Sequence, residues 1–573
     1  MSDYTPNILI FFADDLGFGD VSCLNPNGKI PTPSIDRLAR DGMVFTDAHS
    51  TSAVCSPSRY SLLTGRYNWR SRLQSGIVRH YGDPLIDSDR LTVAGLLREH
   101  GYRTGCIGKW HLGMGWDFEV DESFLPGKEA FEGRDSRSEP LASEVERERW
   151  REAFSKPTTG GPTTRGFDYY FGVDVPNWPP YCFIENESTV GIPSEYLPSR
   201  LIGNNQASNP GPAMPYWHFE QLLPTWARKA DEFIRDSARE NAPFFLYVGY
   251  TAPHWPLHAL PDDIAKYEGR YRKGGWDALR TARHEEMKGL GLVSDRWEIS
   301  PRDDEAPPWE EVKARDWEDM RMAVYAAQID RMDQGIGRIV AKLQELEIDD
   351  NTLVIFLADN GGCAEFLQED GWCQRYATQT PDGKPIRTGN FKNVQPGGPD
   401  TFMSYDLPWA NASNAPFRLY KHWVHEGGIS TPLIVRWPQK IEASRIEHSV
   451  AHVVDLMATC LDAAGVPYPE EYNDHAIQPL EGESLVPAMT GDGWQRERPV
   501  FWEHEGNRAV RDGRWKLVSK YPGDWELYDM VADRTELNDL SGSNQPQADK
   551  MISDYKVWAA EKKVRPWPVK QQH

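Results

Sequence analysis

Apolar runs of strand length alternate with helical patterns along most of the chain. The run at residues 7–13 (Asn-Ile-Leu-Ile-Phe-Phe-Ala) is nearly continuous, which is typical of a strand buried on both faces of a parallel sheet. Comparable runs predict further strands at residues 102–107, 243–249, 352–358 and 431–437. Helical patterns lie between them, at residues 34–40, 92–100, 226–239 and 320–346. We therefore predict an α/β fold with a large, mostly parallel sheet sandwiched by helices.

The pattern changes after a predicted helix at residues 453–464. Four short segments with strand patterns follow at residues 499–503, 508–511, 515–520 and 526–529, separated by turn residues such as Asp512-Gly513. They predict a small antiparallel sheet, and a last helical pattern covers residues 547–562. We expect two units, a large domain over residues 1–467 and a C-terminal α+β subdomain over residues 468–573.

Charge narrows the classes of partner. The 63 basic and 86 acidic side chains give the 573-residue chain a net charge of −23. This balance argues against a general nucleic-acid binder, because no domain-wide basic stripe is present to displace counterions. An anionic small substrate stays compatible with it, since a few cations focused in a cleft outweigh a distant negative surface.

Membrane spans and disulfides are also not expected. The longest apolar runs are far shorter than the ~20 residues that a spanning helix needs. The N-terminal Met-Ser-Asp-Tyr lacks the features of a secretory signal, so we expect a cytoplasmic chain; a trimmed signal leaves a periplasmic or secreted location open. Seven cysteines without a Cys-x-x-Cys pair predict neither a disulfide framework nor a zinc site. No feature decides the oligomeric state.

Acidic and amide side chains follow two of the predicted strands directly. Asp14 and Asp15 end the first strand, and Asp359 and Asn360 end the strand at residues 352–358. Ligands of open α/β sheets bind at the carboxyl ends of strands. Four oxygen donors suit a hard cation such as Ca²⁺ or Mg²⁺. Ordinary turn chemistry explains either pair alone, but two pairs at two strand ends favour a cation site.

A short helix is predicted to begin at the segment Cys-Ser-Pro-Ser-Arg, residues 55–59. Ser56 is the expected N-cap, Pro57 fits the first helical position and Gly65 ends the helix. Cys55 then lies beside the positive end of the helix, where anions are stabilised. A lone cysteine is more often inert core, but these polar neighbours favour a chemical role for Cys55.

Cations and imidazoles occur in other strand-end loops. Lys109 and His111 share one loop after a predicted strand, His254 follows the strand at residues 243–249, and Lys421 precedes Glu426. Taken singly, each lysine is more often a solvated charge and each histidine a structural one. Their shared placement after strands hints that they converge, although the spacing alone does not establish it.

Taken together, these motifs resemble those of the formylglycine-dependent sulfatases of the alkaline phosphatase superfamily. The Cys-x-Pro-Ser-Arg signature is present from Cys55 to Arg59, and residues 108–113 (Gly-Lys-Trp-His-Leu-Gly) match the second sulfatase signature. The strand-end acidic pairs and the segment from Lys421 through Glu426-Gly-Gly match the metal and distal-lysine segments. The resemblance covers nearly the whole chain, and it extends to bacterial arylsulfatases and polysaccharide sulfatases. It implies an alkaline phosphatase-like fold and a sulfuric ester hydrolase.

The resemblance also implies a nucleophile and a metal. Cys55 would be oxidised to formylglycine by a formylglycine-generating enzyme, and the hydrate of that aldehyde would be the nucleophile. One divalent cation, Ca²⁺ rather than Mg²⁺, would bind residue 55 and the sulfate. Its other ligands would be Asp14, Asp15, Asp359 and Asn360.

Five further side chains receive roles from the same resemblance. Lys109, His254 and Lys421 would bind the sulfate oxygens, and the latter two would also protonate the leaving alcohol. Arg59 would steady the hydrate. His111 would deprotonate the second hydroxyl of the covalent adduct, which expels sulfate and restores the aldehyde.

Two other functions stay open. One is a phosphonate monoester or phosphodiester hydrolase of the same superfamily, because sulfate and phosphoryl centres are nearly isosteric. The other is a non-catalytic protein that binds sulfated glycans. The substrate itself, an aryl sulfate or a sulfated carbohydrate, is not specified. We expect the outer pocket to include Trp178, from the segment at residues 177–181, and the Arg70-Ser71-Arg72 segment, with Trp178 stacking on the leaving group.

Overall fold

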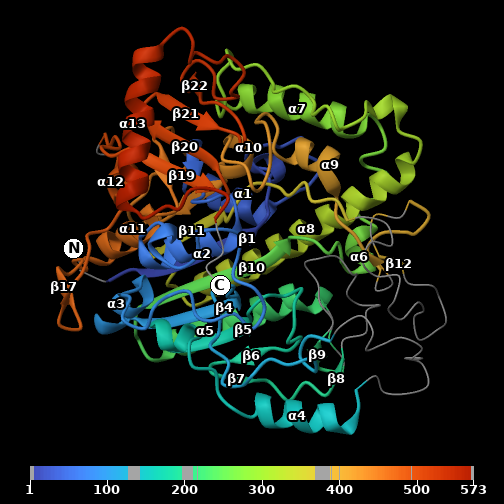
Figure 1. Ribbon diagram of the computed structural model, residues 1–573, viewed down its shortest axis with the longest axis vertical. Coiled ribbons are helices and arrows are strands. Elements are labelled where there is room, and N and C mark those ends of the chain that lie inside the picture. The colour runs from blue at the N-terminus through green and yellow to red at the C-terminus, as the bar shows by residue number, and fades with distance from the viewer. Residues whose placement is uncertain are drawn as a thin grey trace.

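The computed structural model describes residues 5–126, 142–196, 211–367, 387–398, 401–491 and 493–569, apart from positions 216, 218, 389, 391 and some side chains. A sheet of ten strands runs through the centre of the molecule (Figure 1). Its strand order is β15-β2-β14-β11-β1-β10-β4-β5-β6-β7. Helices cover both faces, so the predicted α/β architecture is confirmed.

Four parallel neighbours form the middle of this sheet. β1 (Asn7–Asp14) lies between β11 (Thr352–Ala358) and β10 (Phe244–Pro253), and β10 pairs on its other side with β4 (Arg103–Lys109). All four match predicted strands. The fifth predicted strand, β14 (Leu433–Arg436), is present but runs antiparallel to β11. The sheet is therefore mixed, with its parallel part at the centre.

The outer strands of this sheet are shorter, and the chain also forms isolated pairs. The outer strands are β2 (Met43–Phe45), β15 (Arg445–Glu447), β5 (Tyr169–Val173), β6 (Ile184–Glu185) and β7 (Ser188–Thr189). The pairs join β3 (Ala48–His49) to β16 (Ala451–His452), β8 (Glu195–Tyr196) to β9 (Pro212–Ala213), β12 (Arg387–Thr388) to β13 (Thr401–Phe402), and β17 (Glu471–Tyr472) to β18 (His475–Ala476).

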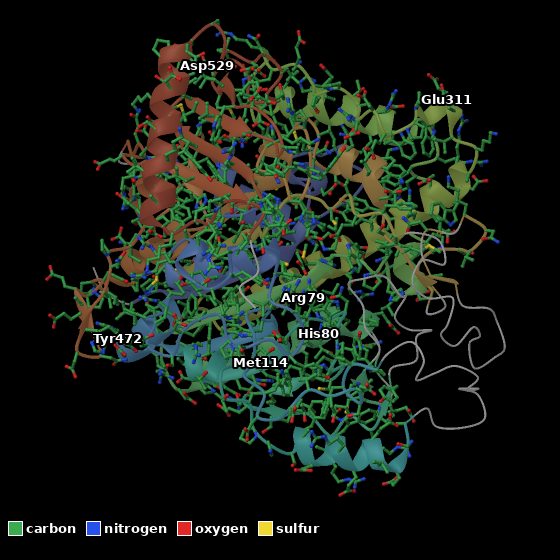
Figure 2. The ribbon with its side chains drawn as sticks, viewed as in Figure 1. Arg79, His80, Met114, Glu311, Tyr472 and Asp529 are labelled. Carbon is green, nitrogen blue, oxygen red and sulfur yellow. The ribbon has the colours of Figure 1, made fainter. Side chains whose placement is uncertain are left out.

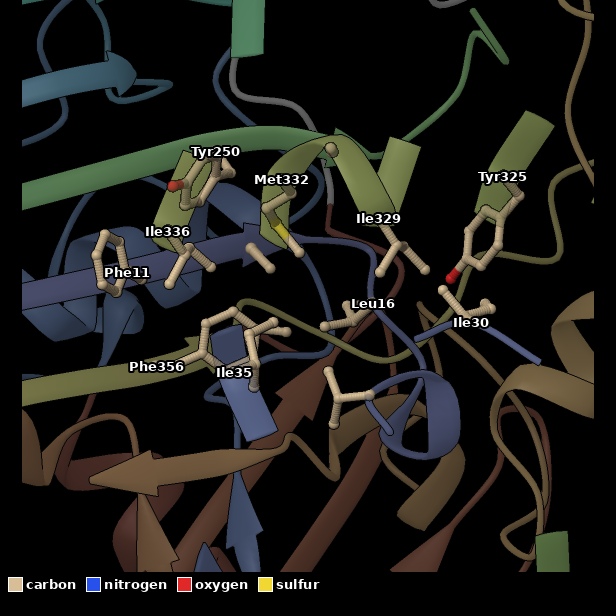
Figure 3. Close-up of a cluster of buried hydrophobic side chains, with 14 of the residues drawn as sticks. Phe11, Leu16, Ile30, Ile35, Tyr250, Tyr325, Ile329, Met332, Ile336 and Phe356 are labelled. Atoms are coloured by element: carbon tan, nitrogen blue, oxygen red, sulfur yellow. The ribbon is translucent and has the colours of Figure 1, made fainter. Parts of the chain in front are cut away.

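Alternate side chains of β1 enter two different cores. Leu9, Phe11 and Ala13 pack with helices α1 (Pro33–Arg40), α5 (Leu222–Arg239) and α8 (Arg315–Glu345). Figure 3 shows Phe11 and Phe356 on the side of Ile336 and Met332 of α8, whereas Ile329 of the same helix lies toward Leu16. On the opposite face, Ile8, Ile10 and Phe12 pack with α2 (Cys55–Thr64), α3 (Val93–Glu99) and α11 (Asp455–Ala464). Burial on both faces explains why the sequence of β1 is almost continuously apolar.

Besides the C-terminal helix at residues 545–561, six further α-helices are described, and some of them add side chains to these two cores. They are α4 (Glu144–Phe154), α6 (Pro261–Ile264), α7 (Gly275–Gly289), α9 (Asp406–Ser413), α10 (Glu426–Ile429) and α12 (Val486–Thr490). The sequence patterns did not predict them. In the described part of the chain, no helix combines the length and the apolar character that a membrane span requires.

A second, antiparallel sheet follows near the C-terminus, as predicted. It contains β19 (Val500–His504), β20 (Asn507–Asp512), β21 (Trp515–Ser519) and β22 (Glu526–Asp529). One face packs on helix α13 (Gln545–Glu561), and the other packs on Ala53, Val424 and Ile429. In Figure 1 the red strands of this sheet lie between α13 and α10. The C-terminal sheet therefore touches the segments that carry Cys55 and Lys421. The boundary expected at residues 467/468 stays a prediction.

Candidate active site

The candidate side chains converge at the carboxyl edge of the central strands. β11, β1, β10 and β4 are neighbours and parallel, so their ends bring Asp359, Asp14, His254 and Lys109 to one edge. Gly108 assists this arrangement, because a Cβ atom there would lie 2.0 Å from the carbonyl oxygen of Gly249. β4 and β10 are thus able to approach closely just before Lys109.

Four oxygen-bearing side chains form the centre of the site. Asp15 donates its backbone N–H to Asp359 Oδ1 at 3.1 Å, and Asn360 Nδ2 donates to Asp15 Oδ1 at 2.7 Å. Asp14 Oδ1 and Asn360 Oδ1 are buried and lack a hydrogen-bond partner. One ligand atom each of Asp14, Asp359 and Cys55 lies within 4.8 Å of the others. The residues present therefore fit a cation with hard oxygen ligands.

The acidic pair at this centre is electrostatically strained. Burial and the neighbouring Asp14 raise the pKa of Asp359 to about 8. Burial opposes ionisation of Asp14 too, but Lys109, His254 and Arg59 lower the pKa of Asp14 below its usual range. Two buried carboxylates that cannot both ionise easily are stabilised by a divalent cation, which binds the charged form of both.

Two buried cations hold this acidic centre in place. Arg59 Nη2 donates to Asp359 Oδ2 at 2.9 Å, and Lys109 Nζ donates to Asp14 Oδ2 at 2.8 Å. The other arm of Arg59 donates to the hydroxyl of Tyr247 at 2.9 Å. Sequence reasoning missed Tyr247, because nothing in a buried strand distinguishes a tyrosine that packs from one that orients an arginine.

Lys421 and His254 form a second polar pair. Lys421 Nζ lies 3.0 Å from Asp15 Oδ2 and 3.3 Å from His254 Nε2. His254 Nδ1 donates to the carbonyl of Trp255 at 2.5 Å, so Nε2 accepts from the ammonium group. Burial disfavours the charge on Lys421, but Asp15 and Glu365 raise the pKa of Lys421 well above its usual value. Lys421 is therefore a protonated donor in this site.

The predicted helix is present as α2, but it begins at Cys55 itself rather than after Ser56, so the expected cap is wrong. Val54 precedes the helix without any side-chain cap, and the Ser56 hydroxyl instead accepts the backbone N–H of Val78 at 3.1 Å. Ser56 lies inside the helix and so contacts the next loop. Burial raises the pKa of the Cys55 thiol to about 11, although Lys109 and Lys421 oppose this. An unmodified Cys55 thus carries little thiolate near neutral pH.

His111 combines burial with a free ring nitrogen. Its Nε2 donates to the carbonyl of Val78 at 3.0 Å, and its Nδ1 is buried without a hydrogen-bond partner. Burial, with Lys109 and Arg59, lowers the pKa of His111 well below its usual value. The imidazole is therefore neutral, and Nδ1 is able to accept a proton.

Trp178, which the sequence analysis expects in the outer pocket, lies beside His111. The two rings are 6.5 Å apart between centroids, and Trp178 also packs edge-to-face on His80 at 5.1 Å (His80 is labelled in Figure 2). The indole is only 7% exposed. Stacking of Trp178 on a leaving group stays a prediction.

Replacing Trp178 by alanine tests this role. We expect KM for an aryl sulfate to rise about two- to tenfold, which corresponds to about 0.5–1.5 kcal/mol for one aromatic contact. Steady-state kinetics measure the change. Trp525, which directly precedes β22 and packs on Tyr555 of α13, provides the control variant Trp525→Ala. An unchanged KM in Trp178→Ala contradicts the stacking role.

The two arginines expected near the outer pocket have partners elsewhere. Arg70 pairs with Glu481 at 2.7 Å, and the exposed Arg72 donates to the carbonyl of Asp83. Their role in the outer pocket stays a prediction.

Another acidic cluster lies away from this site and contains Asp47, His49 and Glu426, whose ligand atoms are close enough together for a metal. Here cations already neutralise the carboxylates. Lys516 lies 2.7 Å from Glu426, and Arg534 Nε lies 2.8 Å from it. We interpret this cluster as an ion-pair network between the C-terminal sheet and α10.

Comparisons with known proteins agree with this geometry. The sulfatase family matches residues 6–466, and the C-terminal family of N-sulphoglucosamine sulphohydrolase matches residues 417–562. The chain is 31% identical over 591 residues to an uncharacterised sulfatase of Schizosaccharomyces pombe, covering 97% of this chain and 94% of the relative. It is 26% identical to an N-acetylgalactosamine-6-O-sulfatase of Bacteroides thetaiotaomicron (96% and 92% covered) and 28% identical to an arylsulfatase of Klebsiella aerogenes (84% and 91% covered).

Solved structures share the fold over the whole chain. A 6S-sulfatase from a glycosaminoglycan-metabolism locus of Bacteroides thetaiotaomicron aligns with a TM-score of 0.65 at 23% identity, covering 98% of this chain and 99% of that one. A protein in complex with its substrate D-glucosamine-2-N,6-O-disulfate aligns with a TM-score of 0.57 at 18% identity (99% and 100% covered). The phosphonate monoester hydrolase of Agrobacterium radiobacter aligns with a TM-score of 0.50 at 20% identity (97% and 96% covered).

These matches confirm the resemblance in the sequence. The family match spans most of the chain, and the S. pombe relative is covered almost completely. The chain therefore belongs to the sulfatase family, the sulfuric ester hydrolases of the alkaline phosphatase superfamily.

Proposed function

We propose that this sulfatase hydrolyses sulfate monoesters with a formylglycine at position 55 and one divalent cation, Ca²⁺ in preference to Mg²⁺. The observation that carries the proposal is the single buried cluster of Cys55, two acidic strand ends and the cations Arg59, Lys109 and Lys421. Conversion of Cys55 by a formylglycine-generating enzyme is part of the proposal. It explains how a thiol with a raised pKa takes part in chemistry.

The cation would be held by residue 55 and by the oxygen atoms of four side chains: Asp14, Asp15, Asp359 and Asn360. Asp14 Oδ1 and Asn360 Oδ1, which accept no hydrogen bond from the described residues, support this ligand set. When bound, the cation lowers the cost of ionising a hydroxyl and neutralises part of the sulfate charge.

The basic side chains and imidazoles of the chain would bind the substrate and transfer protons. Lys109 and Lys421 would bind sulfate oxygens, and Arg59, fixed by Asp359 and Tyr247, would orient the side chain of residue 55. Lys421, protonated and next to His254, would supply the proton that the leaving alcohol needs. His111, neutral with a free Nδ1, would accept the proton of the second hydroxyl at position 55, which releases sulfate.

The substrate class follows from the relatives. Named relatives act on N-acetylgalactosamine 6-sulfate or on aryl sulfates, and one solved relative holds a sulfated glucosamine. We propose a sulfated carbohydrate as the natural substrate and aryl sulfates as convenient probes. A hydrolase for phosphonate monoesters or phosphodiesters is the alternative, because the same inner residues fit a phosphoryl centre.

Paired kinetics distinguish a sulfatase from a phosphonate hydrolase. Protein produced together with a formylglycine-generating enzyme is assayed on an aryl sulfate and on the matched aryl phosphonate, before and after removal of divalent cations by a chelator. We expect a higher kcat/KM for the sulfate, loss of turnover after chelation and its return with Ca²⁺. A higher kcat/KM for the phosphonate moves the function to the alternative. Turnover that resists chelation contradicts the cation.

A further inference from the structure

A carboxylate and an imidazole lie together beside Lys421 and His254. Glu365 Oε1 is 3.2 Å from His422 Nε2, and Glu365 Oε2 accepts the indole N–H of Trp255 at 2.5 Å. His422 directly follows Lys421, and Trp255 directly follows His254. The Glu365–His422 pair therefore lies on the side of the site where the leaving alcohol would receive its proton.

The backbone holds His422 in an unusual conformation. Its φ is +82°, in the left-handed region that a non-glycine residue adopts only with backbone strain. Its N–H donates to the carbonyl of Ala53 at 3.0 Å, and its carbonyl accepts Asn507 Nδ2 at 3.2 Å. Its Nδ1 lies 3.4 Å from His504 Nε2. Such strain concentrates at functional sites, and here it fixes an imidazole that is 41% exposed.

Glu365 has free capacity to accept hydrogen bonds. Its side chain is 33% exposed. Burial opposes ionisation, but Lys421, His422 and His254 hold the pKa of Glu365 well below its usual value. An ionised carboxylate offers about four lone-pair sites, and among the residues that the structure describes each oxygen accepts one N–H. The remaining sites suit hydroxyl donors, whereas the charge repels a nearby carboxylate or second sulfate.

We propose that Glu365 and His422 form a subsite that binds hydroxyl groups of a neutral saccharide leaving group. The inference rests on the proposed function and adds to it the part of the substrate that is not sulfate. It makes Glu365 a specificity-determining residue, because hydroxyl-free alcohols gain nothing from the pair.

The test compares three sulfate esters in the wild type and in Glu365→Gln. N-acetylgalactosamine 6-sulfate carries hydroxyl groups, cyclohexylmethyl sulfate has a similarly poor leaving group without them, and 4-nitrophenyl sulfate has a good leaving group. We expect kcat/KM of the variant to fall roughly tenfold or more on the sugar sulfate and to change less than about threefold on the other two. Glu310→Gln, an exposed carboxylate outside the site, is the matched control.

The three substrates separate the outcomes. An equal fall of kcat/KM on all three substrates overturns the subsite and shows that Glu365 only positions Lys421 and His254. No fall on any of them overturns it as well. A wild type that hydrolyses none of the sulfates contradicts the proposed function, and then weaker binding of free N-acetylgalactosamine to Glu365→Gln, measured by calorimetry, still decides on the subsite. Thermal unfolding of Glu365→Gln and of a second variant, His422→Gln, checks that a loss of activity is not caused by misfolding.

Discussion

Replacement of Cys55 by alanine is expected to lower kcat/KM for an aryl sulfate by about 10⁴- to 10⁶-fold, the scale on which loss of a covalent nucleophile acts. The variant loses the atom from which the nucleophile is made. The buried cations Arg59 and Lys109 keep their carboxylate partners, so the acidic centre stays intact. The measurement is steady-state turnover, with mass spectrometry of the peptide that carries residue 55 in the wild type.

The control is Cys23→Ala, which removes a partly exposed cysteine that packs against the α8 side of the sheet. We expect this variant to retain wild-type turnover. Activity of Cys55→Ala within tenfold of the wild type contradicts a nucleophile at position 55. Full activity of a wild type whose residue 55 is an unmodified cysteine contradicts the formylglycine.

The second large effect concerns stability. Replacing Lys516 by methionine is expected to lower the free energy of unfolding by about 3–5 kcal/mol, the usual cost of breaking a buried ion pair. Lys516 Nζ is fully buried and lies 2.7 Å from both Glu426 and Glu536. Without it these two carboxylates lose their shared counter-charge. The midpoint of denaturant unfolding measures the change.

Lys550 offers the matched control. It also pairs with two carboxylates, Asp512 and Asp554 at 2.9 Å each, but its side chain is 55% exposed. We expect Lys550→Met to cost no more than about 1 kcal/mol, because solvent screens exposed pairs. Equal midpoints for the two variants would show that the buried network does not stabilise the fold.

The sequence predicted the centre of the molecule better than its rim. Strands such as β1 and β11 are buried on both faces, so their apolar runs are unmistakable. Strands of two residues, such as β6 and β7, carry no periodicity that a pattern could reveal. The antiparallel direction of β14 depends on its partners, and sequence pattern alone does not encode it.

Some contacts of the candidate site could likewise be predicted from the sequence, and others could not. The closeness of Asp14 and Asp359 was predictable, because Asp14 ends β1 and Asp359 directly follows β11, two strands that turned out to be neighbours. The contacts of Glu365 were not, since they join segments 57 and 110 residues apart. The prediction that Ser56 caps the helix was wrong, because its hydroxyl accepts the backbone N–H of Val78 in the next loop instead of an N–H of its own helix. Local rules do not capture contacts of this kind.

The packing of the C-terminal sheet also sets an order of events during biosynthesis. Its inner face covers Ala53, Val424 and Ile429, and its strands, at residues 500–529, are synthesised after the segments around residues 55 and 421. Until that sheet docks, the segments around residues 55 and 421 lack their cover. In the folded chain the Cys55 side chain is 1% exposed. Under the proposed conversion of Cys55, the oxidising enzyme would therefore have to reach this cysteine early, before strands β19–β22 close over the segment on which it works.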